Sequence, residues 1–175
     1  MRVRSPSVLV GRPAAPIRLL TDATGPSGAT VTYPLPAVTD PDASSPPAAV
    51  CTPPSGSVFP IGTTTVTCTA TDSNDINSPA SISFTITVEG AAAQLADLHQ
   101  AVHGVGSGNS LASIVAIAEQ QVSAGHPGQA CLTLSGFIIE VKTQIPLIPS
   151  ATAAQLITDA ARIQAVLGCG SQPAL

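Results

Sequence analysis

Apolar and hydroxyl-bearing residues alternate strictly between Thr63 and Asp72. Val66, Cys68 and Ala70 occupy every second position. The positions between them are Thr65, Thr67, Thr69 and Thr71. Because successive side chains of a strand point to opposite faces of a sheet, this pattern predicts a β-strand with one buried edge and one edge in water. The threonine edge is a candidate ligand face, weighed against the more ordinary role of a solvated sheet surface.

A second alternating stretch covers residues 81–88. Its apolar positions, separated by Ser and Thr, are Ile82, Phe84, Ile86 and Val88. Shorter extended segments are expected, between turns rich in Pro, Gly, Asp and Ser, at residues 29–33, 37–39, 48–52 and 58–62. Several short strands with frequent turns predict a β-sandwich.

The spacing of apolar residues changes at Gly90, from two to between three and four. Four stripes follow this spacing: Leu95, Leu98 and Val102; Leu111, Ile114, Val115, Ala118 and Val122; Ala130, Leu134, Phe137, Ile138, Val141 and Ile145; Leu156, Ala160, Ile163 and Leu167. Such stripes predict amphipathic helices. Breaks at 104–109, 125–127 and 146–150 separate them, and Gly168 is suited to end the last one. Together they predict a small antiparallel helical bundle.

The composition limits which residue types can form the core and which classes of partner the chain can bind. With three Phe, one Tyr and no Trp, the core is expected to be aliphatic, so covalent cross-links would help to stabilise it. Four of the six basic residues precede residue 19, whereas ten acidic residues are present. A chain without a basic face is a poor candidate for binding a phosphate backbone, so nucleic acid is not an expected partner.

The four cysteines fall two in each predicted half of the chain: Cys51 and Cys68, then Cys131 and Cys169. Four cysteines permit three pairings, and the sequence alone does not choose among them. One disulfide per half is our hypothesis. Cys68 shares the apolar edge with Val66, so its partner is expected across the core, with Cys51 as the candidate. Disulfides imply an oxidising compartment, and no Cys-x-x-Cys or Cys/His zinc spacing competes with this interpretation.

The N-terminal residues are not expected to form a secretory signal, which needs an apolar run of about 7–15 residues. Arg12 and Arg18 interrupt the N-terminal region, and the apolar run at residues 8–10 is short. No later stretch approaches the roughly 18 apolar residues of a membrane span, so membrane insertion is not expected. We therefore expect a piece of a longer secreted or cell-surface protein, or a misassigned start, with a cytosolic protein carrying free thiols as the alternative.

Two histidines on the first predicted helix could share a metal ion, because His99 and His103 are four residues apart. Gln100 stands where a zinc protease has its catalytic Glu, and no third ligand is evident. We therefore expect polar helix residues here, with no metal site and no cofactor.

Three other sequence patterns bear on calcium binding, phosphate binding and catalysis. Calcium prefers loop oxygens of the kind found at Asp40, Asp42, Asp72, Asn74 and Asp75. No EF-hand spacing is present, and Asp and Asn are also ordinary turn formers. The glycine-rich segment 104–108 lacks the Lys of a phosphate-binding loop, so an interhelix loop is expected. No G-x-S-x-G elbow occurs, and we expect no catalytic residue.

The first half of the chain resembles the HYR (hyalin repeat) domain over residues 14–89. The matching runs are GPSGATVTY (25–33), VCTPPSGSVFPIGTTTVTCTATD (50–72) and ISFTITV (82–88). Residues 15–20 are a degenerate version of the apolar strand that opens the family. The resemblance implies an immunoglobulin-like sandwich with a Cys51–Cys68 disulfide. It also implies a role in extracellular adhesion or as an accessory part of a secreted enzyme.

The second half is similar to small helical modules of the FIVAR/FIMAH type, which follow binding domains in secreted bacterial proteins. The relevant runs are CLTLSGFIIEVKTQ (131–144) and AAQLITDAARI (153–163). Neither family carries a catalytic constellation, so these resemblances imply a non-enzymatic chain.

These observations combine into one prediction of architecture and role. We expect an all-β immunoglobulin-like sandwich followed by a small all-α helical bundle, with a flexible lead-in at 1–13, the sandwich at 14–89, the bundle at 91–169 and a tail at 170–175. The expected function is a monomeric, non-catalytic adhesion or spacer module pair of a secreted or surface bacterial protein, binding extracellular protein or carbohydrate. The alternative is the accessory C-terminal region of a secreted hydrolase whose catalytic domain is absent from this chain.

Overall fold

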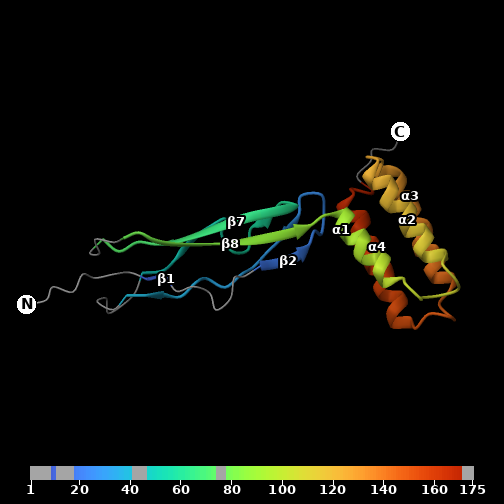
Figure 1. Cartoon of the computed structure of the whole chain (residues 1–175), viewed down its shortest axis with the longest axis horizontal. Coiled ribbons are helices and arrows are strands. Elements are labelled where there is room, and N and C mark those ends of the chain that lie inside the picture. Colours follow the sequence, from blue (N-terminus) through green and yellow to red (C-terminus); the bar gives the residue numbers. More distant parts are fainter. Residues whose placement is uncertain (1–8, 11–17, 41–46, 74–77, 171–175) are drawn as a thin grey trace, which may run out of the picture. The chain divides into compact units, whose positions relative to one another are not determined.

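The structure is a computed structural model of the chain, and it describes residues 9–10, 18–40, 47–73 and 78–170. Strands occupy the first half of these residues and helices the second (Figure 1). The strands are β1 (Leu9–Val10), β2 (Arg18–Asp22), β3 (Ala29–Thr30), β4 (Val38–Thr39), β5 (Val50–Thr52), β6 (Val58–Phe59), β7 (Gly62–Ala70) and β8 (Ala80–Glu89). The helices are α1 (Ala91–Ala101), α2 (Ser110–Ser123), α3 (Pro127–Thr143) and α4 (Ser150–Val166). The predicted fold class, a β-sandwich followed by a helical bundle, is confirmed.

The main sheet has the strand order β2-β8-β7-β5, and two short pairs, β1 with β4 and β3 with β6, accompany it. The alternation read from the sequence is present in β7, where Val66, Cys68 and Ala70 are buried while Thr65 and Thr67 are exposed. Strand β1 pairs with β4 although the sequence placed its residues in a flexible lead-in. A two-residue strand is too short to give a period, so pattern analysis has nothing to detect there.

Three aromatic side chains meet in the core of the sheet region. Tyr33 contacts Phe59 and Phe84 edge to face, with ring centroids 6.3 and 5.1 Å apart. All three are nearly inaccessible to solvent, and the Tyr33 hydroxyl donates a hydrogen bond to the carbonyl of Pro53. The expectation of an aliphatic core is therefore wrong for this region, because the few aromatic residues are concentrated in one place.

The cysteines lie in the two pairs that the hypothesis placed one in each half. Cys51 of β5 and Cys68 of β7 face each other in register, with Cα atoms 3.9 Å apart. Their bond therefore joins neighbouring strands of one sheet, and the expectation of a partner across the core is wrong. Cys131 of α3 bonds Cys169, just beyond α4, with Cα atoms 5.7 Å apart.

The described residues form two compact units. The first, here called the sheet unit, comprises residues up to Thr21 together with Thr30–Thr87. The second, the helical unit, comprises Asp22–Ala29 and the residues from Val88 onward. The segment Asp22–Ala29 thus belongs with the helices, although it lies within residues 14–89. The predicted domain boundaries themselves stay a prediction.

Each helix of the helical unit buries most of the apolar stripe that its spacing predicted, while Ile114, Val122, Ile138 and Leu167 are half-buried. The stripe residues with at most 2 % exposure are Leu95, Leu98, Val102, Leu111, Val115, Ala118, Ala130, Leu134, Phe137, Val141, Leu156, Ala160 and Ile163. Ile145 is an exception, because α3 ends at Thr143 and the Ile145 side chain is 47 % exposed. None of the described helices is both long enough and apolar enough to cross a membrane.

The end of α4 explains how Cys169 reaches Cys131. Gly168 adopts a φ of 76°, a left-handed conformation that suits glycine. The Gly168 N–H donates to the Ala165 carbonyl at 3.1 Å, and the Cys169 N–H donates to the Gln164 carbonyl at 2.9 Å. These two bonds are the Schellman motif that closes many helices, so the predicted role of Gly168 is confirmed.

A buried glutamine fixes the glycine-rich segment between α1 and α2. Gln144, at the end of α3, accepts a hydrogen bond from the Ser107 N–H at 2.9 Å and donates one to the Ser110 hydroxyl at 3.1 Å. Gly106 has a φ of 78°, and a Cβ atom there would collide with the Gln144 amide. The segment is therefore an interhelix connection, in agreement with the sequence.

Candidate functional site

The threonine edge of β7 is part of a wider surface. Thr65 and Thr67 are exposed, Thr69 is half-buried, and Thr71 is exposed beyond the end of β7. The register with β5 places Thr52 opposite Thr67 and Val50 opposite Thr69. Because residues directly opposite each other share one side of a sheet, β5 extends the same surface.

Strand β8 completes this surface through hydrogen bonds between hydroxyl groups. The Thr63 Oγ1 lies 3.1 Å from the Thr87 Oγ1, and the Thr67 Oγ1 lies 3.0 Å from the Ser83 Oγ. We call this surface the hydroxyl face; its members are Thr52, Thr63, Thr65, Thr67, Thr69, Ser81, Ser83, Thr85 and Thr87. None of these side chains is charged, and each hydroxyl can both donate and accept. The ligand role of Thr65, Thr67, Thr69 and Thr71 stays a prediction.

The loop acids are only partly visible. Asp40 is buried and Asp72 is half-buried, and the Asp72 N–H donates a hydrogen bond to the Ser78 hydroxyl oxygen at 2.8 Å. Asp42, Asn74 and Asp75 lie outside the described residues. Calcium binding by these loop residues, and the alternative that they only form turns, therefore both stay predictions.

The two histidines lie side by side at the end of α1. The imidazole rings of His99 and His103 are within 20° of parallel, with centroids 6.0 Å apart. His99 also contacts α2, where its Nδ1 atom lies 3.0 Å from the Glu119 Oε2 atom. Glu119 was not considered from the sequence, because twenty residues separate it from His99 and no short motif links the two.

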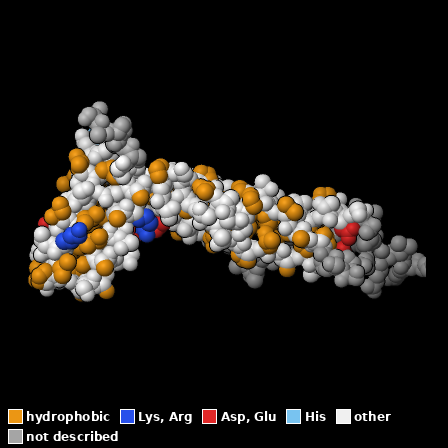
Figure 2. Space-filling view, turned by 180° about the vertical axis from the view of Figure 1, so that it is seen from behind, with side chains coloured by type: hydrophobic (Ala, Val, Ile, Leu, Met, Phe, Trp, Pro, Cys, Tyr) orange, Lys and Arg blue, Asp and Glu red, His pale blue; other side chains and the backbone are white. Residues whose placement is uncertain are grey.

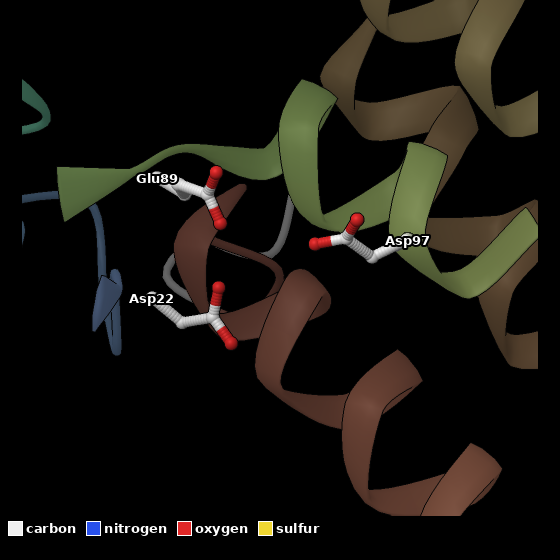
Figure 3. A group of neighbouring side chains, drawn as sticks. All are labelled: Asp22, Glu89 and Asp97. Carbon is white, nitrogen blue, oxygen red and sulfur yellow. The ribbon is translucent and has the colours of Figure 1, made fainter. Parts of the chain in front are cut away.

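A group of three carboxylates in the helical unit was also missed. Asp22, Glu89 and Asp97 bring their oxygen atoms within 4.8 Å of one another, from the ends of β2 and β8 and from α1 (Figure 3). Burial, followed by the charges of Asp97 and Asp22, raises the pKa of Glu89 above its ordinary value. Arg162 of α4 places its Nη2 atom 2.9 Å from Asp22 Oδ2, so part of the negative charge is compensated within the chain.

Gln94 of α1 joins this acidic group to the backbone around it. Its side chain is 1 % exposed, and its Nε2 donates to the carbonyls of Ala23 at 3.0 Å and Glu89 at 2.8 Å. Its Oε1 accepts a hydrogen bond from the Arg162 Nε at 3.1 Å. The donors and acceptor of Gln94 thus hold the segment that begins at Asp22 against α1 and α4. This arrangement serves the packing of the helical unit.

The surface of the chain carries few charged groups. Figure 2 shows scattered hydrophobic side chains and large uncharged areas on the face that it presents. This agrees with the composition, in which 9 % of the residues are Asp, Glu, Lys or Arg.

Comparison with known protein families gives a match in the first half of the chain. Residues 20–88 match the family model of the HYR domain, which supports the predicted resemblance. The similarity of the second half to FIVAR/FIMAH-type modules is not confirmed. No curated protein and no solved structure matches the chain. Residues 20–88 are thus similar to the HYR domain, a non-catalytic family of extracellular, adhesion-type domains.

Proposed function

We propose that this chain is a non-catalytic extracellular module pair, used for adhesion or spacing in a secreted or cell-surface bacterial protein. The observation that carries the proposal is the HYR match over a disulfide-bonded sheet. The family is extracellular, and the two disulfides suit an oxidising compartment. We also propose that the chain acts as a monomeric module, to be checked by its mass in solution.

The hydroxyl face is the surface that we propose for ligand contact. Its nine uncharged hydroxyl side chains could exchange hydrogen bonds with the hydroxyl groups of a carbohydrate. Strand β5 lies at one edge of the four-stranded sheet, and Val50 on the same side is 70 % exposed. An edge strand offers unpaired backbone groups to an extended peptide, so an extracellular protein is the second ligand class.

The test is a binding array of glycans and extracellular matrix proteins probed with the full chain. The variant Thr65→Lys/Thr67→Lys places two long charged side chains on the hydroxyl face. The matched control, Ser123→Lys/Thr158→Lys, makes the same change at exposed positions of α2 and α4. We expect binding by the unmodified chain to fall at least tenfold in the first variant, on the order of the loss expected for blocked hydrogen bonds at a site, and to persist in the control.

Two results would redirect the proposal. If the unmodified chain binds nothing on either array, adhesion is contradicted and spacing remains. If both variants lose binding equally, the ligand contacts do not lie on the hydroxyl face. The accessory role in a secreted hydrolase is tested separately, by sequencing the coding region upstream of Met1 for an in-frame catalytic domain.

A further inference from the structure

His99 and His103 follow each other by one helical turn at the end of α1. The His103 N–H donates to the Gln100 carbonyl at 3.2 Å, which keeps the turn closed after α1 ends. Both rings therefore project from the same side of this turn, and their near-parallel arrangement at 6.0 Å reflects that spacing. Two histidines one turn apart can ligate one ion when a ring nitrogen of each points toward it, as in the i, i+4 histidine pairs of metal sites. Here this requires the exposed His103 ring to rotate out of the stacked arrangement.

Glu119 determines which nitrogen of His99 is free. An ionised carboxylate only accepts hydrogen bonds, so the 3.0 Å contact assigns the proton to His99 Nδ1 and leaves the lone pair on Nε2. Histidines that ligate metals commonly donate their other N–H to a carboxylate in this way, which fixes the tautomer and the ring orientation. The His99 and Glu119 side chains are 30 % and 32 % exposed, so an ion can reach them from solvent.

His103 is exposed, and among the described residues its ring has the stacked contact with His99 and no hydrogen-bond partner. Its nitrogens are thus available for ligation. Competing thiolates are absent from the described chain, because all four cysteines are in disulfides. Imidazole nitrogen suits Cu²⁺, Ni²⁺ and Zn²⁺, whereas Ca²⁺ and Mg²⁺ prefer oxygen ligands.

The sequence led us to expect no metal site here, but the Glu119 contact was not visible in it. We propose that His99 and His103 form a binding site for one divalent transition-metal ion on the surface of the helical unit, with Glu119 as the positioning residue. Solvent water would complete the coordination. The site is independent of the proposed adhesion function, since it lies in the other unit from the hydroxyl face. It also differs in chemistry from the group of Asp22, Glu89 and Asp97, which offers oxygen atoms alone.

The test is isothermal titration of the full, oxidised chain with CuCl₂, NiCl₂, ZnCl₂ and CaCl₂ in a non-chelating buffer. We expect one ion per chain, with Cu²⁺ bound most tightly and no Ca²⁺ binding at this site, following the usual order of divalent affinities. His99→Gln and His103→Gln should each lower the affinity at least tenfold. His126→Gln is the matched control, because His126 is the third histidine of the chain, is exposed, and precedes α3 away from the pair in sequence.

Glu119→Gln separates positioning from ligation. Loss of an orienting carboxylate commonly costs about 10–100-fold in metal affinity, so we expect weaker binding with unchanged stoichiometry. The ¹⁵N spectrum should show the Nδ1–H tautomer of His99 in the unmodified chain and a mixture of tautomers in Glu119→Gln, a difference that a purely structural role would not produce. Far-UV circular dichroism confirms that each variant keeps its helices.

Several outcomes would overturn the proposal. Absence of binding to all three transition-metal ions is one, and unchanged affinity in His103→Gln is another. Equal losses in His103→Gln and His126→Gln would show non-specific histidine binding. Loss of transition-metal binding in Asp97→Asn, with retention in His103→Gln, would place the ion at the carboxylate group instead.

Discussion

The sheet unit and the helical unit connect their elements in different ways. In the sheet unit the backbone ladder fixes the register, so Cys51 and Cys68 meet directly opposite each other, 17 residues apart in sequence. In the helical unit each helix satisfies its own backbone hydrogen bonds, and no ladder joins one helix to the next. The links between segments there come from apolar packing, from the disulfide across 38 residues, and from the buried amides of Gln94 and Gln144.

The two units also differ in the residues that form their cores. Three of the four Phe and Tyr rings lie together in the sheet unit, whereas the helical unit contains Phe137 among aliphatic residues. The difference indicates that backbone pairing gives the sheet its geometry and a compact aromatic cluster fills it. The helices must obtain their geometry from side chains. A substitution in one unit should therefore lower the stability of that unit more than the stability of the other.

The largest expected effect is the removal of one buried phenylalanine ring from each unit. Phe59 and Phe137 are both 0 % exposed, which makes Phe59→Ala and Phe137→Ala a matched pair. Each should lower the free energy of unfolding of its own unit by about 3–5 kcal/mol, because a large cavity replaces the ring. Tyr33 is the single Tyr of a chain without Trp, so its fluorescence during urea denaturation reports on the sheet unit, while helical circular dichroism reports on the other.

Phe59→Ala should thus move the fluorescence transition and Phe137→Ala the circular dichroism transition. If either variant moves both transitions equally, the chain unfolds as one cooperative body and the comparison between units fails.

The next effect is the loss of a disulfide from each unit. On the chain-entropy model, closing loops of these lengths contributes about 3 kcal/mol for Cys51–Cys68 and about 4 kcal/mol for Cys131–Cys169. Cys131→Ala/Cys169→Ala should therefore destabilise the helical unit by about 4 kcal/mol, and Cys51→Ala/Cys68→Ala the sheet unit by about 3 kcal/mol, in the same denaturation experiment. Non-reducing peptide mapping of the unmodified chain checks the pairing; a cross-link between the halves would contradict it.

A smaller effect is expected from the buried amide of Gln94. Gln94→Leu removes the donor to the Ala23 carbonyl and the acceptor of the Arg162 Nε. The Glu89 carbonyl also loses the Gln94 donor but keeps the hydrogen bond from the Ala23 N–H. Each buried group left unsatisfied costs roughly 1–3 kcal/mol, so we expect the free energy of unfolding of the helical unit to fall by about 2 kcal/mol. Hydrogen–deuterium exchange should also rise at residues 22–29, since Gln94 holds that segment.

The matched control for this change is Gln155→Leu, because Gln155 is an exposed glutamine of α4. It should alter stability by less than about 0.5 kcal/mol. If exchange at residues 22–29 is the same in Gln94→Leu as in the unmodified chain, the segment does not depend on this amide.

The sequence predicted the parts of the fold that follow from local periodicity. Alternation in β7 and β8 and the stripes of the four helices correctly indicated which faces are buried. The Gly168 cap was also predictable, because a helix end requires a residue that tolerates positive φ. Ile145 shows the limit of this reasoning, since it continues the spacing of α3 after the helix has ended.

Contacts between distant residues could not be predicted in the same way. The aromatic cluster, the partner of Gln94 and the group of Asp22, Glu89 and Asp97 each bring together residues from separate elements. A single sequence contains no spacing rule for such contacts, because they depend on tertiary packing. The His99–Glu119 contact is of this kind, so the sequence showed two histidines without the carboxylate beside them.

The smallest expected effect concerns pH and the helical unit. The pKa of Glu89 is raised mainly by burial and then by the charges of Asp97 and Asp22, so its ionised form is disfavoured in the folded state. Ionisation as the pH rises through the ordinary Glu value of about 4.3 therefore costs stability, and this cost is absent below that range. The hydroxyl face of the sheet unit has no comparable dependence, since its side chains do not titrate in this range.

Glu89→Gln should consequently be slightly more stable than the unmodified chain at neutral pH, by up to about 0.5 kcal/mol, because the side chain is not fully buried. The difference should disappear as the pH is lowered below about 4. Asp97→Asn removes the second cause of the raised pKa, so in that background the gain from Glu89→Gln should shrink. Thermal unfolding followed by circular dichroism at neutral and acidic pH measures both variants, and a Glu89→Gln protein that is less stable at neutral pH would show that the Glu89 carboxylate is favoured in the folded state after all.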